Sequence, residues 1–166
     1  MFIRVKTING QKYGYIVENK WAKGTSRQKV AKYIGKITDE GLTRPATTNN
    51  EKIREAVQEL IEAHLKEKGY EKDKETLTKD KIKIHIATRT VKNKGKNAVI
   101  KINNGYLCKE TIEKAEKQPE NIKEMAENLT NAGINMTPEE FARIAQKIMP
   151  EKEQGKKEKI FEEFYY

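Results

Sequence analysis

The sequence predicts an α+β protein, in which a three-stranded antiparallel N-terminal sheet is followed by a helix, a β-hairpin and a C-terminal helical part. Three patterns support this fold class. Apolar and polar residues alternate over residues 2–36 and again over residues 82–86, as in half-buried strands. Apolar residues recur instead at helical spacing over residues 50–68. The last third of the chain repeats this helical spacing in shorter segments.

Residues 2–36 are expected to form a β-meander. The dipeptide Asn9-Gly10 separates its first two alternating segments, and Asn-Gly favours the positive φ angles of a hairpin turn. Gly35 is expected to end the third strand. In chain order we expect a strand at 2–7, a strand at 11–18, a loop at 20–26 and a strand at 27–34.

Residues 38–49 (TDEGLTRPATTN) are polar and rich in turn-forming residues, so they are the expected linker between two domains. The pattern leaves open whether the β segments on either side of this linker form one sheet. The chain is accordingly divided into a basic meander at 1–37, the linker at 38–49, an α+β domain at 50–150 and a charged, aromatic tail at 151–166.

The α+β domain is expected to begin with a helix at about 50–68, which Asn49 or Asn50 caps. A lysine-rich connection then leads to a hairpin between residues 82–86 and 98–102. Three helical segments complete the domain. They are expected at Lys109–Lys117, from Pro119 to Gly133, and after Thr137, where Thr-Pro-Glu-Glu forms a capping box.

The positive charge of the chain is concentrated near its N-terminus. The first 38 residues hold nine Lys and Arg residues and one acidic residue, Glu18, whereas the remaining 128 hold 25 basic and 24 acidic residues. Because ordinary surfaces mix the two signs, this excess favours a polyanionic partner. We expect nucleic acid to bind here, at Arg4, Lys6, Lys12, Tyr13, Tyr15, Lys20, Trp21, Lys23, Arg27, Gln28, Lys29, Lys32, Tyr33 and Lys36.

These side chains have different expected roles. The lysines suit phosphates, while Arg27 and Gln28 have the fork geometry that suits the edges of guanine and adenine. Aromatic residues pack well within sheets, so the three tyrosines are expected to lie mostly in the core. The alternative is that these three tyrosines, Tyr13, Tyr15 and Tyr33, stack on unpaired bases together with Trp21.

The first 37 residues, MFIRVKTINGQKYGYIVENKWAKGTSRQKVAKYIGKI, resemble the segment that opens many prokaryotic insertion-sequence transposases of the DDE type. They are also similar to small uncharacterised archaeal proteins that share this opening. The resemblance implies DNA binding. It does not imply DNA cleavage, because the chain has three aspartates and the residues after 37 show no catalytic core. The matching residues are Arg4, Lys6, Tyr13, Tyr15, Glu18, Arg27, Gln28, Lys29, Tyr33, Gly35 and Lys36.

We expect no enzymatic activity, no cofactor and no bound metal. The two histidines and one cysteine are too few for a zinc site with four nitrogen or sulfur ligands, and the single serine, Ser26, has no evident catalytic partner. His64 is expected in a core or interface, and Cys108 is expected to be a small buried hydrophobic residue. No apolar run is long enough to cross a bilayer and the start is too polar for a signal peptide, so we expect a cytoplasmic protein without membrane contact.

Two functions from different classes remain in view. The first is a non-catalytic nucleic-acid-binding protein, with DNA favoured and RNA or ribosome association as the other possibility. The second is a protein-interaction adaptor, in which the basic sheet contacts an acidic protein. The aromatic tail is expected either to pack back on its own domain or to dock into a groove on a protein partner, and a homo-oligomer is possible. The tail residues with suitable spacing are Phe161, Phe164 and Tyr165.

Overall fold

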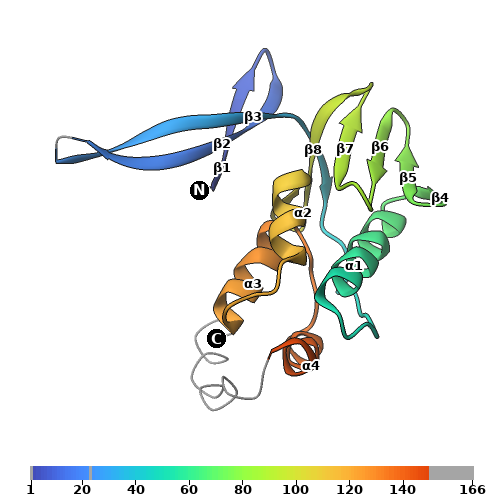
Figure 1. The fold of residues 1–166 in the computed structure, drawn as a ribbon. Coiled ribbons are helices and arrows are strands. Elements are labelled where there is room, and N and C mark those ends of the chain that lie inside the picture. Colours follow the sequence, from blue (N-terminus) through green and yellow to red (C-terminus); the bar gives the residue numbers. More distant parts are fainter. Residues whose placement is uncertain (1, 23, 150–166) are drawn as a thin grey trace.

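The computed structural model describes residues 2–22 and 24–149, which adopt the expected α+β fold (Figure 1). Its helices lie together on one side of the strands β4 to β8. In chain order the elements are β1 (Phe2–Ile8), β2 (Gln11–Ala22), β3 (Thr25–Gly41), α1 (Ile53–Glu67), β4 (Glu71–Asp73), β5 (Thr76–Lys79), β6 (Ile82–His85), β7 (Thr90–Asn93), β8 (Lys96–Ile102), β9 (Gly105–Leu107), α2 (Lys109–Glu116), α3 (Ile122–Asn131) and α4 (Pro138–Ile148).

The strands of the described residues form a single sheet. Its order is β1-β2-β3-β8-β7-β6-β5-β4, and β9 pairs with β8. The meander β1–β3 is antiparallel, as predicted, and Asn9 and Gly10 have the positive φ angles expected of the turn. Parallel pairing of β3 with β8 joins this meander to the later strands. The sheet therefore crosses the boundary at which two domains were expected.

Gly35 does not end the third strand, because β3 continues to Gly41. The backbone of Gly35 has a φ of +130°, and a Cβ at this position would lie 2.3 Å from the carbonyl oxygen of Asn97. Only glycine permits this approach without displacing the neighbouring backbone. The residue expected to stop β3 is therefore the one that allows β3 to meet β8.

Both faces of β8 are buried, each in a different apolar cluster. Ala98, Ile100 and Ile102 belong to the larger core, which also contains apolar residues of the four helices. Val99 points to the other side and belongs to a smaller cluster with Ile16, Ile34, Ile37 and Cys108. Burial of Cys108 raises the pKa of its thiol, and the predicted role as a small buried residue is confirmed.

The segment expected to be a linker is packed against the helices. Residues 38–41 belong to β3, and the side chains of Thr43, Ala46 and Thr48 are buried. The Ala46 amide donates to the Asn135 carbonyl at 2.9 Å, and the Thr48 amide donates to Glu140 at 2.8 Å. This polar sequence is compatible with burial because its backbone groups find partners in the helical part.

His64 is buried, as predicted, and connects this packed segment to the helical core. Its Nδ1 lies 2.7 Å from the Thr43 hydroxyl, and its Nε2 accepts a hydrogen bond from the Asn135 amide at 3.0 Å. Burial of the ring lowers the pKa of His64 to about 4. The imidazole is therefore neutral at neutral pH and serves as a structural bridge.

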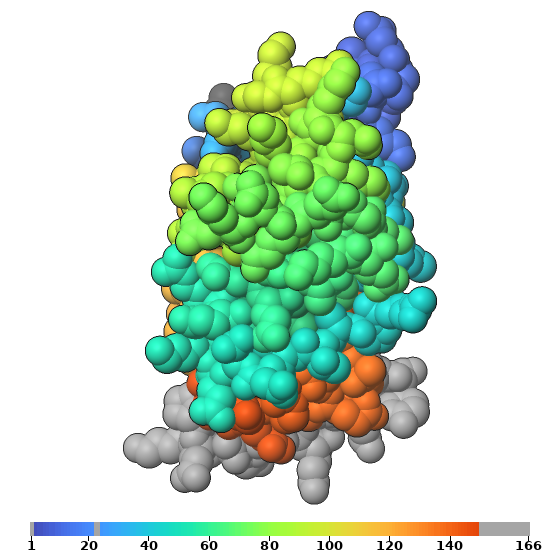
Figure 2. Space-filling view, turned by 90° about the vertical axis from the view of Figure 1, so that its right-hand side faces the viewer, coloured from blue at the N-terminus to red at the C-terminus, as the bar shows by residue number. Residues whose placement is uncertain are grey.

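Several later boundaries differ from the predictions. The lysine-rich connection forms β4 and β5, and β7 lies between the two strands of the expected hairpin. Helix α1 begins at Ile53 without a side-chain cap, because its N-cap residue is Lys52 and not Asn49 or Asn50; the side-chain amide of Asn50 donates to Glu59 at 2.6 Å. Helix α3 is capped by Asn121, two residues after Pro119, whereas Thr137 caps α4 as predicted. Figure 2 shows β4–β7 above α1 and α4.

Candidate nucleic-acid interface

The sheet formed by β1–β3 has one apolar face and one basic, aromatic face. Ile3, Val5 and Ile16 pack in or against the smaller cluster. Successive side chains of a strand point to opposite faces of the sheet, and residues paired across two strands share a face. The side chains that alternate with these apolar residues therefore lie together on the other side. We call this side the tyrosine face; it carries Arg4, Lys6, Tyr13, Tyr15, Gln28, Tyr33 and Lys36.

The three tyrosines form a cluster outside the core. The Tyr33 ring centroid lies 5.3 Å from that of Tyr15 and 6.4 Å from that of Tyr13. Tyr33 is 50% exposed, and its partial burial beside the other two rings raises its pKa. The expectation that these tyrosines lie mostly in the core is wrong. Isoleucines on the other face fill that role, so the rings are left on the surface.

Two basic side chains are held against this cluster. The Lys6 ammonium lies 5.1 Å from the centroid of the Tyr15 ring, within the range of a cation–π interaction. The Arg4 guanidinium donates to the Gln28 side chain at 3.2 Å. Arg4 and Gln28 therefore present their remaining polar groups together, next to the tyrosines.

The strands β2 and β3 continue past Phe2, the residue at which β1 begins, as a two-stranded ribbon. We call this ribbon the arm (residues 18–22 and 25–29). The last pair between β1 and β2 is Phe2 with Val17, whereas β2 pairs with β3 out to Ala22 and Thr25. Figure 1 shows the arm projecting from the rest of the molecule. The loop expected at 20–26 is thus mostly strand, and Gly24, with a φ of +76°, lies in the tight turn.

The arm exposes side chains on both of its faces. Residues 25–33 of β3 are all exposed, and Lys20 is paired in register with Arg27. Trp21 is the most exposed of the large hydrophobic residues in the described parts of the chain, at 80%. A two-stranded ribbon without a third strand or a covering helix has no core in which to bury such a residue.

Within residues 2–22 and 24–149, one predicted nucleic-acid-binding cation forms an ion pair. Lys32 lies on the apolar side and its ammonium is 2.5 Å from Glu110 of α2, which raises the pKa of Lys32 by hydrogen bonding and by charge. No ion pair is formed within these ranges by Arg4, Lys6, Lys12, Lys20, Arg27, Lys29 or Lys36. The predicted residues Lys23, Phe161, Phe164 and Tyr165 lie outside the described residues.

A second basic surface was missed by the sequence analysis. Residues 79–101 hold eight Lys and Arg residues and one acidic residue. On the side of the sheet away from the larger core, Lys83 of β6 is directly opposite Lys92 of β7. We call this group the lysine ladder; it consists of Lys81, Lys83, Lys92 and Lys94. A charge count over short windows would have found it, whereas a single count over residues 39–166 averaged it against the acidic helices.

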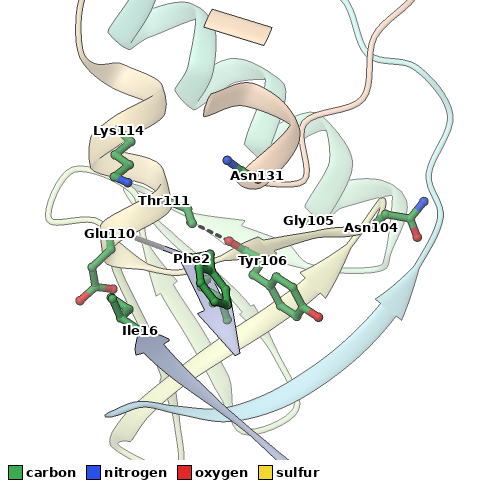
Figure 3. A pocket seen from close by; sticks show the side chains of 10 residues that line it. Phe2, Ile16, Asn104, Gly105, Tyr106, Glu110, Thr111, Lys114 and Asn131 are labelled. Carbon is green, nitrogen blue, oxygen red and sulfur yellow. Dashed lines mark hydrogen bonds between the residues drawn. The ribbon is translucent and has the colours of Figure 1, made fainter. Parts of the chain in front are cut away.

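A pocket of about 200 Å³ lies under the base of the arm, between β1, β2, β9 and α2 (Figure 3). Phe2 and Tyr106 lie at its centre, and the Thr111 hydroxyl donates to the Tyr106 carbonyl at 2.6 Å. Glu110 also lines it and is already paired with Lys32. We therefore interpret this pocket as part of the joint between the strands β1–β3 and helix α2.

Comparison with protein-family models, with curated proteins and with solved structures finds no match to this chain. The resemblance of the first 37 residues to transposase openings consequently stays a prediction. Among the described residues, no helix is long and apolar enough to cross a membrane. In the same part of the chain, no three His, Cys, Asp or Glu side chains are grouped as metal ligands.

Proposed function

We propose that this protein is a non-catalytic nucleic-acid-binding protein of the cytoplasm, and that it contacts its ligand through the arm and the tyrosine face. One observation carries the proposal. Seven of the predicted nucleic-acid-binding cations form no ion pair with the described residues, although all seven lie on the three paired strands β1–β3. Like charges gathered in this way repel one another, and phosphates from a bound polyanion would offset that repulsion.

The chemistry of the tyrosine face supports nucleic acid over a generic acidic partner. An Arg side chain donates hydrogen bonds to base edges and a Gln side chain both donates and accepts them, and Arg4 and Gln28 are held side by side. Tyr33 presents an exposed aromatic ring on which a base can stack. DNA is favoured by the resemblance to transposase openings, with RNA or ribosome association as the alternative.

The salt dependence of binding tests this proposal. We expect fluorescence anisotropy of a labelled 20-base-pair duplex to show an affinity that falls about a thousandfold between 50 and 200 mM salt, as for a protein that contacts about six phosphates. A competition with RNA of equal length then identifies the preferred nucleic acid. An affinity that does not change with salt contradicts the proposal and leaves the adaptor role.

A charge-matched pair of variants locates the contact. Arg27→Ala combined with Lys29→Ala should weaken binding at least tenfold, because both side chains are exposed on the arm. The control combines Lys117→Ala with Lys123→Ala, which removes the same charge from exposed positions after α2 and in α3. The control should change affinity less than twofold. Equal losses would show that net charge, and not the arm, determines binding.

A further inference from the structure

Trp21 occupies an unusual place for the one tryptophan of the chain. It lies one residue before the end of β2, next to the turn of the arm, and is 80% exposed. Tryptophan is normally among the more buried residues, since its ring removes a large apolar area from water when it packs. An exposed ring at the far end of a projecting ribbon therefore suggests contact with a partner.

The surroundings of Trp21 indicate the chemistry of that partner. Trp21 pairs in register with Ser26, and alternation along β2 places it on the same side as Tyr13 and Tyr15. The pairs formed by Lys20 with Arg27 and by Glu18 with Lys29 occupy the opposite side of the arm. The arm thus carries Trp21 on one side and mostly positive charge on the other.

A groove of double-stranded DNA fits this arrangement better than a single strand does. A groove has a phosphate backbone on each wall and base edges at its floor, and two-stranded ribbons are among the elements that enter such grooves. The arm extends about 17 Å beyond β1, from five residues at about 3.3 Å each. A single strand would need one face that carries both basic and aromatic side chains. The tyrosine face is of this kind, but the arm is not, because Trp21 and the Lys20–Arg27 pair lie on its opposite sides.

We propose that Trp21 is a wedge residue, which enters between base pairs of double-stranded DNA when the arm lies in a groove. This inference rests on the proposed nucleic-acid-binding function. Aromatic and apolar side chains inserted in this way unstack a base step and bend the duplex. Stacking of one aromatic ring typically changes affinity by roughly five- to a hundredfold.

The fluorescence of Trp21 gives a direct test, because the chain has no other tryptophan. The full-length protein is titrated with a 20-base-pair duplex and with a single strand of equal length, while anisotropy of a label on the same DNA reports binding. We expect the duplex to quench the tryptophan emission by more than half at saturation. Energy transfer between dyes at the two duplex ends should rise as the DNA bends.

Variants separate the wedge from general apolar contact. Trp21→Ala should reduce duplex affinity about tenfold and abolish the bend, whereas Trp21→Phe should retain most of both. Leu42→Ala is the matched control, because Leu42 is also a large exposed hydrophobic residue, at 69%, and lies outside the arm. The control should leave affinity and bending unchanged.

The outcomes distinguish this inference from the function on which it rests. Duplex binding without quenching of Trp21 overturns the wedge and leaves nucleic-acid binding in place. Quenching by the single strand but not by the duplex also overturns it, and assigns Trp21 to unpaired bases. Absence of binding to either DNA by anisotropy contradicts both proposals for DNA.

Discussion

The two halves of the sheet bury opposite faces. In β1–β3 the side that carries Ile3 and Ile16 packs in the smaller cluster, and the side that carries Tyr15 is open. The pairing of β3 with β8 shows how the two sides continue through the sheet. The open side of β1–β3 is continuous with the buried side of β4–β8, where Ile84 and Val91 enter the larger core. The lysine ladder then lies on the side that was buried in β1–β3.

The exchange of faces shows why the first half is available for binding. The helices cover the side of β4–β8 that contains Ile84, whereas Tyr33 on the tyrosine face is 50% exposed. Among the described residues, the two strands of the arm pair only with each other, and Figure 1 shows the arm projecting from the rest of the molecule. Charge and aromatic rings are tolerated there because their burial is not needed for folding.

The largest effect should come from breaking the joint between the two halves. Gly35→Ala places a Cβ against the Asn97 backbone and at an unfavourable φ, so we expect the free energy of unfolding to fall by about 3 kcal/mol or more. Gly41→Ala is the control, because its φ is +72° and its Cβ would meet no atom within 4 Å. Its expected cost is about 1 kcal/mol. Similar urea unfolding curves for the two variants would show that β3 and β8 do not approach closely.

Acid should destabilise the protein through the buried His64, which lies in α1 beside the larger core. The pKa of His64 is about 4 in the folded protein, against 6.5 for the ordinary side chain. The unfolded chain therefore binds the extra proton first as pH falls, and stability is lost between pH 6.5 and pH 4. The full loss is about 3 kcal/mol. Urea unfolding at several pH values measures it, and an NMR titration in which His64 protonates near pH 6.5 would contradict it.

Removing cations from the lysine ladder should affect DNA binding less than removing cations from the arm. Lys83→Ala with Lys92→Ala removes two cations, as Arg27→Ala with Lys29→Ala does, but from the lysine ladder. We expect less than a threefold loss of duplex affinity, and a gain in stability of about 0.5 kcal/mol because two lysines no longer face each other. Anisotropy and urea unfolding measure the two effects. An affinity loss as large as that of the arm variant would show that the interface covers both halves of the sheet.

The smallest effect should come from the contact between β3 and helix α2. Glu110→Gln removes the carboxylate that pairs with Lys32, whose side chain is 54% exposed. A pair at this exposure contributes at most about 1 kcal/mol to stability. Duplex affinity should rise about twofold, because Lys32 becomes free to meet a phosphate. Unchanged affinity at low salt would show that Lys32 lies outside the interface.

Local patterns predicted the parts of the fold that depend on neighbours in sequence. The Asn9-Gly10 turn, the capping of α4 by Thr137 and the alternation in β1 and β2 were all readable, because each depends on backbone preferences or on side-chain period. Alternation assigns residues to two faces without saying which face is buried. For that reason the side chains of Tyr13, Tyr15 and Tyr33 were placed in the core, when isoleucines occupy it.

The sequence by itself determined the α+β class, the antiparallel meander and the basic character of its exposed side chains, since composition and short-range spacing contain that information. Only the tertiary structure decided that β3 passes through Gly35 to pair with β8, that the two halves bury opposite faces, and that the arm stands clear of the body. The first two of these depend on contacts between residues about 60 apart in the chain, such as Lys36 with Ala98. No local pattern encodes such a contact, because its free energy comes from burial and backbone pairing with a distant strand.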